Sequence, residues 1–192
     1  MFARINSIGL FGLNAYSVSA EISGAPGVPS IDIVGLGDQS VQESRLRIKS
    51  ALGNSGIKLK SMSCVVNLSP ANVRKSGSNF DLPILTALLA VSGFIPSELT
   101  DKAFIGEVAL DGEIRPVTGA LAMAIEASEK GIKELFLPVE NCREVSVVKG
   151  LSVYGVKNVK ALIAHFSGER PIIPFSPEEI TEESYRFALD FA

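Results

Sequence analysis

The sequence contains few of the residues that build metal centres and disulfide frameworks. Its 192 residues include two cysteines, Cys64 and Cys142, and a single histidine, His165. Two cysteines are too few for a disulfide framework, and one histidine without a Cys-x-x-Cys pair argues against a zinc site. We therefore predict no metal site. Both cysteines are expected to be small buried side chains, and His165 a half-exposed surface residue rather than a catalytic base.

The sequence also lacks the motifs of nucleotide-binding and membrane proteins. It has no Gly-x-x-x-x-Gly-Lys-Ser/Thr loop, and after Gly35-Leu36-Gly37 the third glycine position of a dinucleotide-binding loop holds Ser40. The longest apolar run, residues 82–91, is too short to span a bilayer, and the N-terminus has no signal-peptide core. We therefore expect a soluble, cytoplasmic chain without a cofactor of its own.

Acidic residues are absent from one long segment of a chain whose net charge is −3. Residues 44–80 contain no Asp or Glu, and their basic residues are Arg45, Arg47, Lys49, Lys58, Lys60, Arg74 and Lys75. Such a segment is typical of a surface that binds phosphate groups, but also of the solvated face of a helix and its flanking loops. Phe80 is the only aromatic residue in this segment, so a base-stacking platform is not indicated.

The rest of the composition is that of a folded globule, with 46% hydrophobic and 20% charged residues. The hydrophobic periodicity predicts an α/β (α+β) fold in which helices pack on mixed sheets. The first half is expected to hold strands within residues 2–36 and a helix over 40–52 capped by Asp38 and ended by Gly53, followed by a strand over 62–68, a polar loop over 69–80 and a central helix capped by Asp81. The helix over 40–52 is expected to bury an inner face formed by Val41, Ser44, Ile48, Ala51 and Leu52. The second half is expected to hold a hairpin of residues 102–110 and 113–117, an Ala-rich helix over 119–130, a strand over 135–138, a short helix over 141–148, a strand over 152–156 and a helix over 159–166.

Three prolines, Pro171, Pro174 and Pro177, mark a change of character after residue 168. Together with the acidic run that follows them, they predict a linker over residues 169–192 that leaves a domain of residues 1–168. The chain ends within an apolar-periodic stretch that has no helix stop signal. This favours a piece of a longer protein, with a natural C-terminal helix as the alternative.

Three stretches of the sequence together resemble one protein family. They are residues 31–47, 67–83 and 106–119, and their motif residues include Asn67, Pro70, Ala71, Gly77, Phe80, Asp81, Pro83, Gly106, Glu107 and Gly112. In order and spacing they resemble the N-terminal, ChlI-type domain of the magnesium-chelatase-like AAA+ ATPases, the family of the ComM/YifB-like competence proteins. The resemblance covers residues 2–168.

The resemblance implies a fold like that of ribosomal protein S5 domain 2, and an AAA+ module, absent from this chain, that binds ATP and Mg²⁺. It also implies a homohexameric parent protein that uses ATP to migrate DNA branches during natural transformation. This chain would then be a non-catalytic accessory domain that contributes contact with DNA. The alternative is a domain that helps to assemble the ring without touching DNA; the helix over 119–130 is its candidate contact surface, unless that helix only packs in the core.

The second stretch also resembles the catalytic loop of the proteolytic domain of Lon protease, which uses a Ser–Lys dyad. Matched position by position, the nucleophile position holds Asn79 and the lysine position holds Leu121. A Ser–Lys mechanism needs a hydroxyl nucleophile beside a neutral amine, and this chain has neither group at those positions. The resemblance therefore implies a Lon-like fold with a peptidase as only a remote alternative, and we expect no enzyme in this chain.

The candidate DNA contact lies in the polar loop over residues 69–80. In the comparison with Lon, Arg74 and Lys75 lie at the mouth of the former active site, and the other five basic residues of segment 44–80 would widen the contact. In the alternative reading, Arg74 and Lys75 brace the loop through ion pairs. Their candidate partners are Asp81, Glu107 and Glu113.

Overall fold

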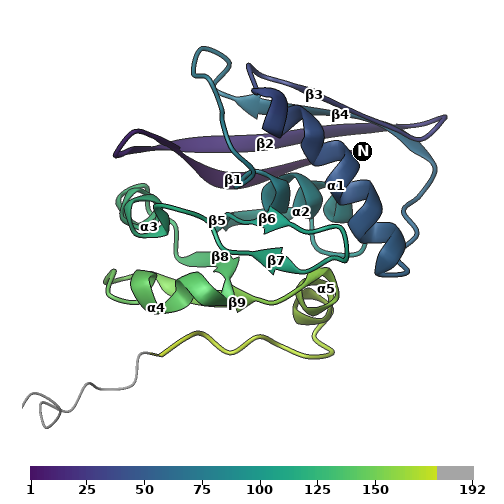
Figure 1. The fold of residues 1–192 in the computed structure, drawn as a ribbon. Helices are drawn as coiled ribbons and strands as arrows, with labels where there is room; N and C mark the ends of the chain where they lie inside the picture. Colours follow the sequence, from purple (N-terminus) through teal and green to yellow (C-terminus); the bar gives the residue numbers. More distant parts are fainter. Residues whose placement is uncertain (177–192) are drawn as a thin grey trace, which may run out of the picture.

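A seven-stranded sheet forms the centre of residues 1–176, the part of the chain that the computed structural model describes (Figure 1). Its strands are β1 (Phe2–Phe11), β2 (Asn14–Pro26), β3 (Ser30–Val34), β4 (Met62–Ser69), β5 (Glu98–Phe104), β8 (Glu134–Pro138) and β9 (Ser152–Val156). They lie in the order β3-β4-β2-β1-β5-β8-β9. Strand β2 pairs antiparallel with β1 and β4, and the other neighbours pair parallel. The sheet is mixed and mostly parallel, which confirms the predicted α/β fold class.

Helices cover both faces of this sheet. They are α1 (Gln39–Asn54), α2 (Asp81–Val91), α3 (Ala120–Glu129), α4 (Cys142–Val145) and α5 (Val159–Phe166), with a 3₁₀ turn η1 (Val139–Asn141) before α4. One apolar core joins α1, α2 and α5 to the sheet, and a second joins α3 and α4 to its other face. In β8, Phe136 belongs to the first core, while Leu135 and Leu137 belong to the second. This two-sided burial is expected for strands of a parallel sheet between helices.

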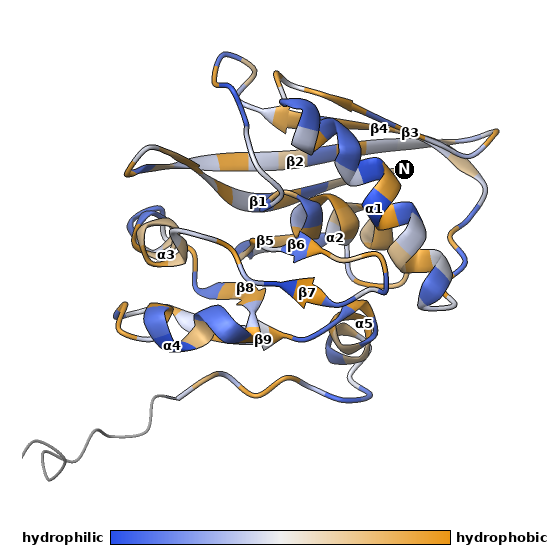
Figure 2. Cartoon of the chain, in the orientation of Figure 1, coloured by the Kyte–Doolittle hydropathy of each residue, from blue (hydrophilic) through white to orange (hydrophobic). Residues whose placement is uncertain are grey.

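Helix α1 follows its sequence prediction closely. The Asp38 carboxylate accepts a hydrogen bond from the Val41 amide at 2.9 Å, as an N-cap does. The predicted inner face of the helix is buried, while much of its outer face is hydrophilic (Figure 2). The residues of this inner face are Val41, Ser44, Ile48, Ala51 and Leu52. The helix ends at Asn54 rather than at Gly53, because the left-handed residue that turns the chain is Gly56, with φ 71°.

Helix α2 confirms one prediction and corrects another. Every one of its residues is buried, as expected of a central helix that is apolar all round. The predicted cap is wrong, because Phe80 occupies the cap position and Asp81 is the first helical residue. The Asp81 side chain turns toward α1 instead of binding the amides of its own helix.

The predicted hairpin of residues 102–117 is also wrong in its first strand. Strand β5 ends at Phe104 and lies in the main sheet between β1 and β8. The hairpin is reduced to β6 (Glu107–Val108) and β7 (Ile114–Arg115). The chain leaves the sheet at Gly106, whose carbonyl accepts from the Leu82 amide at 3.0 Å and whose amide donates to the Asn79 carbonyl at 3.0 Å. A Cβ on Gly106 would lie 2.9 Å from Ile114, so only glycine fits there without a shift.

The first part of the predicted linker packs on the domain. The Arg170 amide donates to Ala164 at 3.0 Å, and the Phe175 amide donates to Val153 of β9 at 2.7 Å. His165 is partly buried, in agreement with the half-exposed surface position predicted for it; its Nδ1 accepts from the Ile172 amide at 3.0 Å, and burial lowers the pKa of its imidazole. The rest of the linker, residues 177–192 with the acidic run, lies outside the described residues. No helix described in residues 1–176 is long and apolar enough to cross a membrane.

Both cysteines are free and buried, as predicted. Burial raises the pKa of Cys142 to about 11, with a smaller contribution from Glu140. Because only the thiolate reacts, we expect alkylation of Cys142 near pH 8 to be at least about 100-fold slower in the folded protein than in denaturant. Mass spectrometry of a Cys64→Ala variant treated with iodoacetamide measures this directly. Equal labelling in native buffer and in denaturant would contradict the burial of this thiol.

Candidate nucleic-acid interface

The loop over residues 69–80 is held against the segment that precedes α1. The Lys75 amide donates to Leu36 at 3.1 Å, and the Asp38 amide donates to Lys75 at 2.9 Å. A Cβ on Gly35 would lie 2.3 Å from the Leu68 carbonyl oxygen of β4. Gly35 therefore allows two backbone segments to approach closely, and a Cβ on Gly37 would lie 2.6 Å from the Val41 side chain. Packing accounts for both glycines without a dinucleotide.

Lys75 does not lie on the surface. Its side chain is 0% exposed, and its Nζ donates to the Pro70 carbonyl. Burial lowers the pKa of this amine, and no ion pair to it occurs within residues 1–176. The structure therefore removes Lys75 from the predicted phosphate-binding set, because a fully buried amine cannot reach a phosphate while the loop is closed.

Arg47 is also engaged within the fold. Its guanidinium forms a two-pronged ion pair with Asp81, from Nε at 2.6 Å and from Nη2 at 2.9 Å. The same carboxylate, which is completely buried, accepts from the Ser44 hydroxyl and from the Val108 amide. Burial raises the pKa of Asp81 while these donors oppose the rise, and the bond to Asp81 raises the pKa of Arg47. The group links α1, α2 and β6, so Arg47 is a structural residue.

The predicted bracing of the loop is not what the structure shows. Asp81 pairs with Arg47, and Glu107 lies 3.9 Å from Arg115 and accepts from the Ser78 hydroxyl. Arg74 is exposed, and among the described residues its side chain has no ion pair. Its carbonyl accepts from the Tyr16 hydroxyl at 3.1 Å, which fixes the backbone and leaves the guanidinium in solvent.

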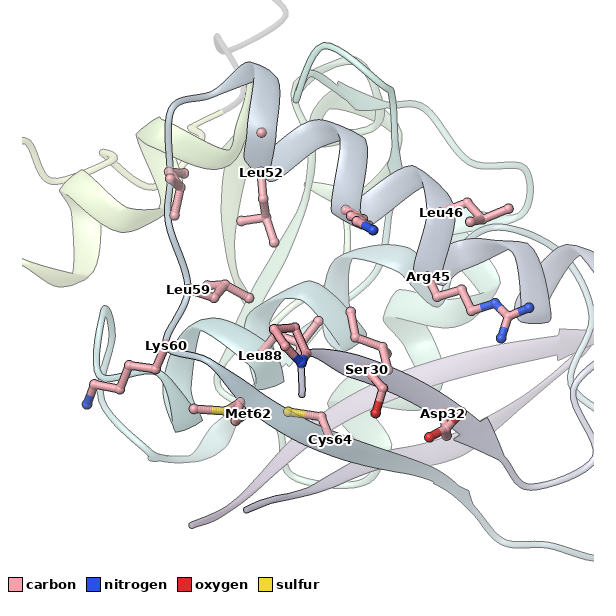
Figure 3. A pocket seen from close by; sticks show the side chains of 15 residues that line it. Ser30, Asp32, Arg45, Leu46, Leu52, Leu59, Lys60, Met62, Cys64 and Leu88 are labelled. Carbon is pink, nitrogen blue, oxygen red and sulfur yellow. The ribbon is translucent and has the colours of Figure 1, made fainter. Parts of the chain in front are cut away.

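The remaining basic residues of segment 44–80 are exposed and lie on or after α1. They are Arg45, Lys49, Lys58 and Lys60, and within residues 1–176 none of them forms an ion pair. Three of them, Arg45, Lys49 and Lys60, line one groove of about 470 Å³ (Figure 3). Lys58 and Arg74 lie outside this lining. The structure thus brings three of the seven predicted residues together and leaves Arg74 apart from them.

The apolar floor of this groove was missed by the sequence reasoning. Met62, Cys64 and Leu88 come from β4 and α2, far apart in the sequence. Leu46 stands between two arginines on the polar side of α1 and is 59% exposed. Because single exposed apolar residues are common on protein surfaces, Leu46 could not have identified the groove from the sequence.

The two positions matched to the Lon dyad lie in the loop before α2 and in the first turn of α3. The side-chain amide of Asn79 donates to the Ile8 carbonyl of β1 at 3.2 Å, and a Cβ on Gly119, which precedes α3, would lie 2.5 Å from Leu10 of β1. Leu121 stands in the first turn of α3, which follows Gly119 directly. An amide and an alkyl group can supply neither nucleophile nor base. Within the described residues, no group of three or more His, Cys, Asp or Glu could hold a metal ion.

Comparison with known proteins assigns this fold to a family. The family model described as subunit ChlI of Mg-chelatase matches residues 20–141, from β2 to the end of η1. The chain belongs to this family. It is thus a member of the magnesium-chelatase-like AAA+ family, as the sequence motifs indicated.

Relatives of this ChlI-family chain agree with the assignment. It is 32% identical to the uncharacterized protein YifB of Escherichia coli over 93% of the chain and 35% of that protein. It is 32% identical to the competence protein ComM of Haemophilus influenzae over 97% of the chain and 36% of that protein. A Lon protease of Rickettsia felis is 25% identical over 81% of the chain and 21% of that protein. The chain therefore spans about a third of the length of the ComM and YifB relatives.

Several ChlI-family motif residues form hydrogen bonds or close packing contacts that stabilise the fold of this chain. The Asn67 amide donates to Ser69 Oγ at 3.0 Å, and the Gly77 amide donates to Asp38 at 3.3 Å. Phe80 is fully buried, and a Cβ on Gly112 would lie 2.4 Å from Ser55 Oγ. These contacts position the loop and the β6–β7 hairpin, so these four motif residues have a structural role in the fold.

Proposed function

We propose that this ChlI-family domain is the non-catalytic accessory domain of a magnesium-chelatase-like AAA+ ATPase, and that it contacts DNA phosphates. The observation that carries the proposal is the set of exposed bases without an ion pair among the described residues. They are Arg45, Lys49, Lys58, Lys60 and Arg74. Bases without neighbouring carboxylates are the groups that release counterions from a nucleic acid.

The relatives support the wider part of this proposal. One of them is a competence protein by name, and both ComM and YifB are about three times as long as the aligned region. In our proposal ATP and Mg²⁺ bind in an AAA+ module outside residues 1–192, and the parent protein is a homohexamer. The parent would then be the ATP-dependent DNA branch-migration motor, with this domain holding the strand that the ring moves.

The DNA contact is tested by fluorescence anisotropy with labelled single-stranded and branched DNA over a range of salt concentrations. Each phosphate contact contributes about 0.7–0.9 to the slope of log K against log[salt]. We expect Arg45→Ala/Lys49→Ala to make the slope shallower by about 1.4–1.8 and to weaken binding at least about tenfold at low salt. Arg74→Ala should remove about one contact.

The matched control is Lys157→Ala/Lys160→Ala, which removes the same charge from the lining of a different cavity beside α5. This variant should keep most of the affinity for DNA. An equal loss in both variants would mean that binding follows net charge, and the proposed interface would be wrong. Failure of the folded domain to bind DNA even at low salt would overturn DNA contact altogether.

The exposed side of α3 favours the second candidate, ring assembly. Ala120, Ala124 and Ala127 face the core, as the packing alternative expected, but Leu121 and Ile125 are 37% and 46% exposed. One turn apart on the helix, they form an apolar strip that a neighbouring subunit could cover. If DNA binding is absent while Ile125→Lys lowers the oligomeric state of the parent protein in sedimentation, assembly becomes the function of the domain.

A further inference from the structure

The groove beside α1 has the architecture of a site for an extended peptide. We call it the α1–β3 groove; its walls are β3 on one side and residues 45–53 of α1 on the other. Strand β3 is an edge strand of the sheet, paired only with β4 among the described residues. The Gln42 side-chain amide donates a hydrogen bond of 3.2 Å to the Ile33 carbonyl near the end of β3, so this carbonyl already has a partner. Ser30, Ile31 and Asp32 lie ahead of that contact and line the groove.

The lining of the α1–β3 groove combines an apolar floor with a basic rim. The floor is formed by Leu52, Met62, Cys64 and Leu88. Figure 3 shows Arg45 and Asp32 at one end and Lys60 at the other, with the floor between them. Lys49 joins the rim from α1, so the rim carries three bases and one carboxylate. A volume of about 470 Å³ is within the range of ligand sites.

From this arrangement we infer that the α1–β3 groove binds an acidic peptide in extended conformation. The peptide adds a strand to the free edge of β3, places alternate apolar side chains on the floor and presents carboxylates to Arg45, Lys49 and Lys60. Strand addition supplies main-chain hydrogen bonds, and the pocket for alternate side chains supplies specificity. In the α1–β3 groove the edge strand β3 supplies the main-chain hydrogen-bonding groups, and α1 forms the wall of the pocket for alternate side chains.

The chemistry of the floor favours a peptide over a nucleic acid in this groove. Unpaired bases bind chiefly by stacking on aromatic side chains, and none of the described lining residues is aromatic. Leucine and methionine side chains pack well against aliphatic side chains. The exposed Leu46, at the rim, would be covered by such a peptide and has no role in phosphate contact. This inference goes beyond the proposed contact with DNA, and the two share only the basic rim.

The test uses the full chain and a short fluorescein-labelled peptide in which Glu alternates with Leu. We expect binding in anisotropy titrations and at least tenfold weaker binding to a peptide in which Lys replaces Glu. Arg45→Ala/Lys49→Ala should weaken the Glu–Leu peptide at least tenfold. Leu46→Gln, which leaves the charge unchanged on an exposed helical position, should weaken the peptide severalfold and leave DNA affinity unaltered.

Lys58→Ala is the reciprocal control, because Lys58 lies outside the groove lining. It should weaken DNA binding and leave the peptide unaffected. Bound peptide should also slow amide hydrogen exchange in residues 30–32, whose outer edge would pair with the peptide while their other edge pairs with β4. The inference is overturned if the Glu and Lys peptides bind equally, if Leu46→Gln has no effect, or if exchange in β3 stays unchanged. If the chain binds the peptide but not DNA, the proposed DNA contact is overturned and the peptide inference stands.

Discussion

Replacing Asp81 by leucine is expected to lower the free energy of unfolding by about 3–5 kcal/mol. The carboxylate is completely buried and binds Arg47 with two hydrogen bonds of 2.6 and 2.9 Å. Its removal leaves a mostly buried guanidinium with the longer, 3.9 Å pair to the exposed Glu43, and it also deprives Ser44 and Val108 of their acceptor. Urea unfolding followed by circular dichroism gives the change directly.

A double variant separates the ion pair from the packing around it. Arg47→Leu/Asp81→Leu removes both charges, and we expect it to recover part of the loss, since an apolar pair does not leave a charge unpaired. Arg4→Ala serves as the control, because the Arg4–Glu21 pair is 2.8 Å long but Arg4 is 60% exposed. Such surface pairs contribute about 0–1 kcal/mol. A loss in Asp81→Leu no larger than in Arg4→Ala would show that the group linking α1, α2 and β6 is not a structural anchor.

Asp81 also shows where sequence reasoning stops. An acidic residue just before an apolar helical run has the local pattern of a helix cap, and that pattern led to the wrong role. Its partner Arg47 is 34 positions earlier, on another helix. Only the packing of α1 against α2 brings the two together. Local patterns therefore located the start of α2 correctly but could not identify what the acid binds.

The features that were predicted correctly depend on short-range order. The inner face of α1 and the burial of α2 follow from residues three or four positions apart. The predicted hairpin was wrong in its first strand because the chain leaves the sheet at Gly106, which is hydrogen-bonded to Asn79 and Leu82 at the start of α2. These contacts join residues that are far apart in the sequence, so local patterns do not reveal them. The same limit applies to the candidate site, where charge counting found Arg45, Lys49 and Lys60 but not the apolar floor between them.

The sequence-based prediction that Lys75 lies on the surface and contacts phosphate is wrong, because its side chain is fully buried. A lysine beside an exposed arginine in a polar loop has every local mark of a surface residue. Its burial results from the pairing of the loop with residues 36–38, which lie before α1. The side chain of Lys75 is fully buried, and within residues 1–176 the Pro70 carbonyl is the one hydrogen-bond partner of its amine.

Lys75→Met is therefore expected to raise the free energy of unfolding near neutral pH by about 1–3 kcal/mol, since methionine keeps the stem and removes a buried polar group whose hydrogen bonds are incomplete. The gain should depend on pH. Burial lowers the pKa of Lys75 in the folded state below its ordinary value of 10.5. Between the lowered pKa and 10.5 the unfolded chain holds more protons than the folded one, so the parent protein gains stability as pH rises.

The difference in the free energy of unfolding between the parent and Lys75→Met should therefore be largest below the lowered pKa of Lys75 and should decrease as pH approaches 10.5. Urea unfolding at a series of pH values measures this convergence. Lys58→Met, at an exposed lysine, is the matched control and should differ from the parent by no more than about 0.5 kcal/mol at any pH. If Lys75→Met is less stable than the parent at every pH, the hydrogen bond to Pro70 stabilises the fold by more than the burial of the amine costs.

Because Lys75 lies away from solvent, Lys75→Met should also keep the DNA affinity of the parent, whereas Arg74→Ala should lower it.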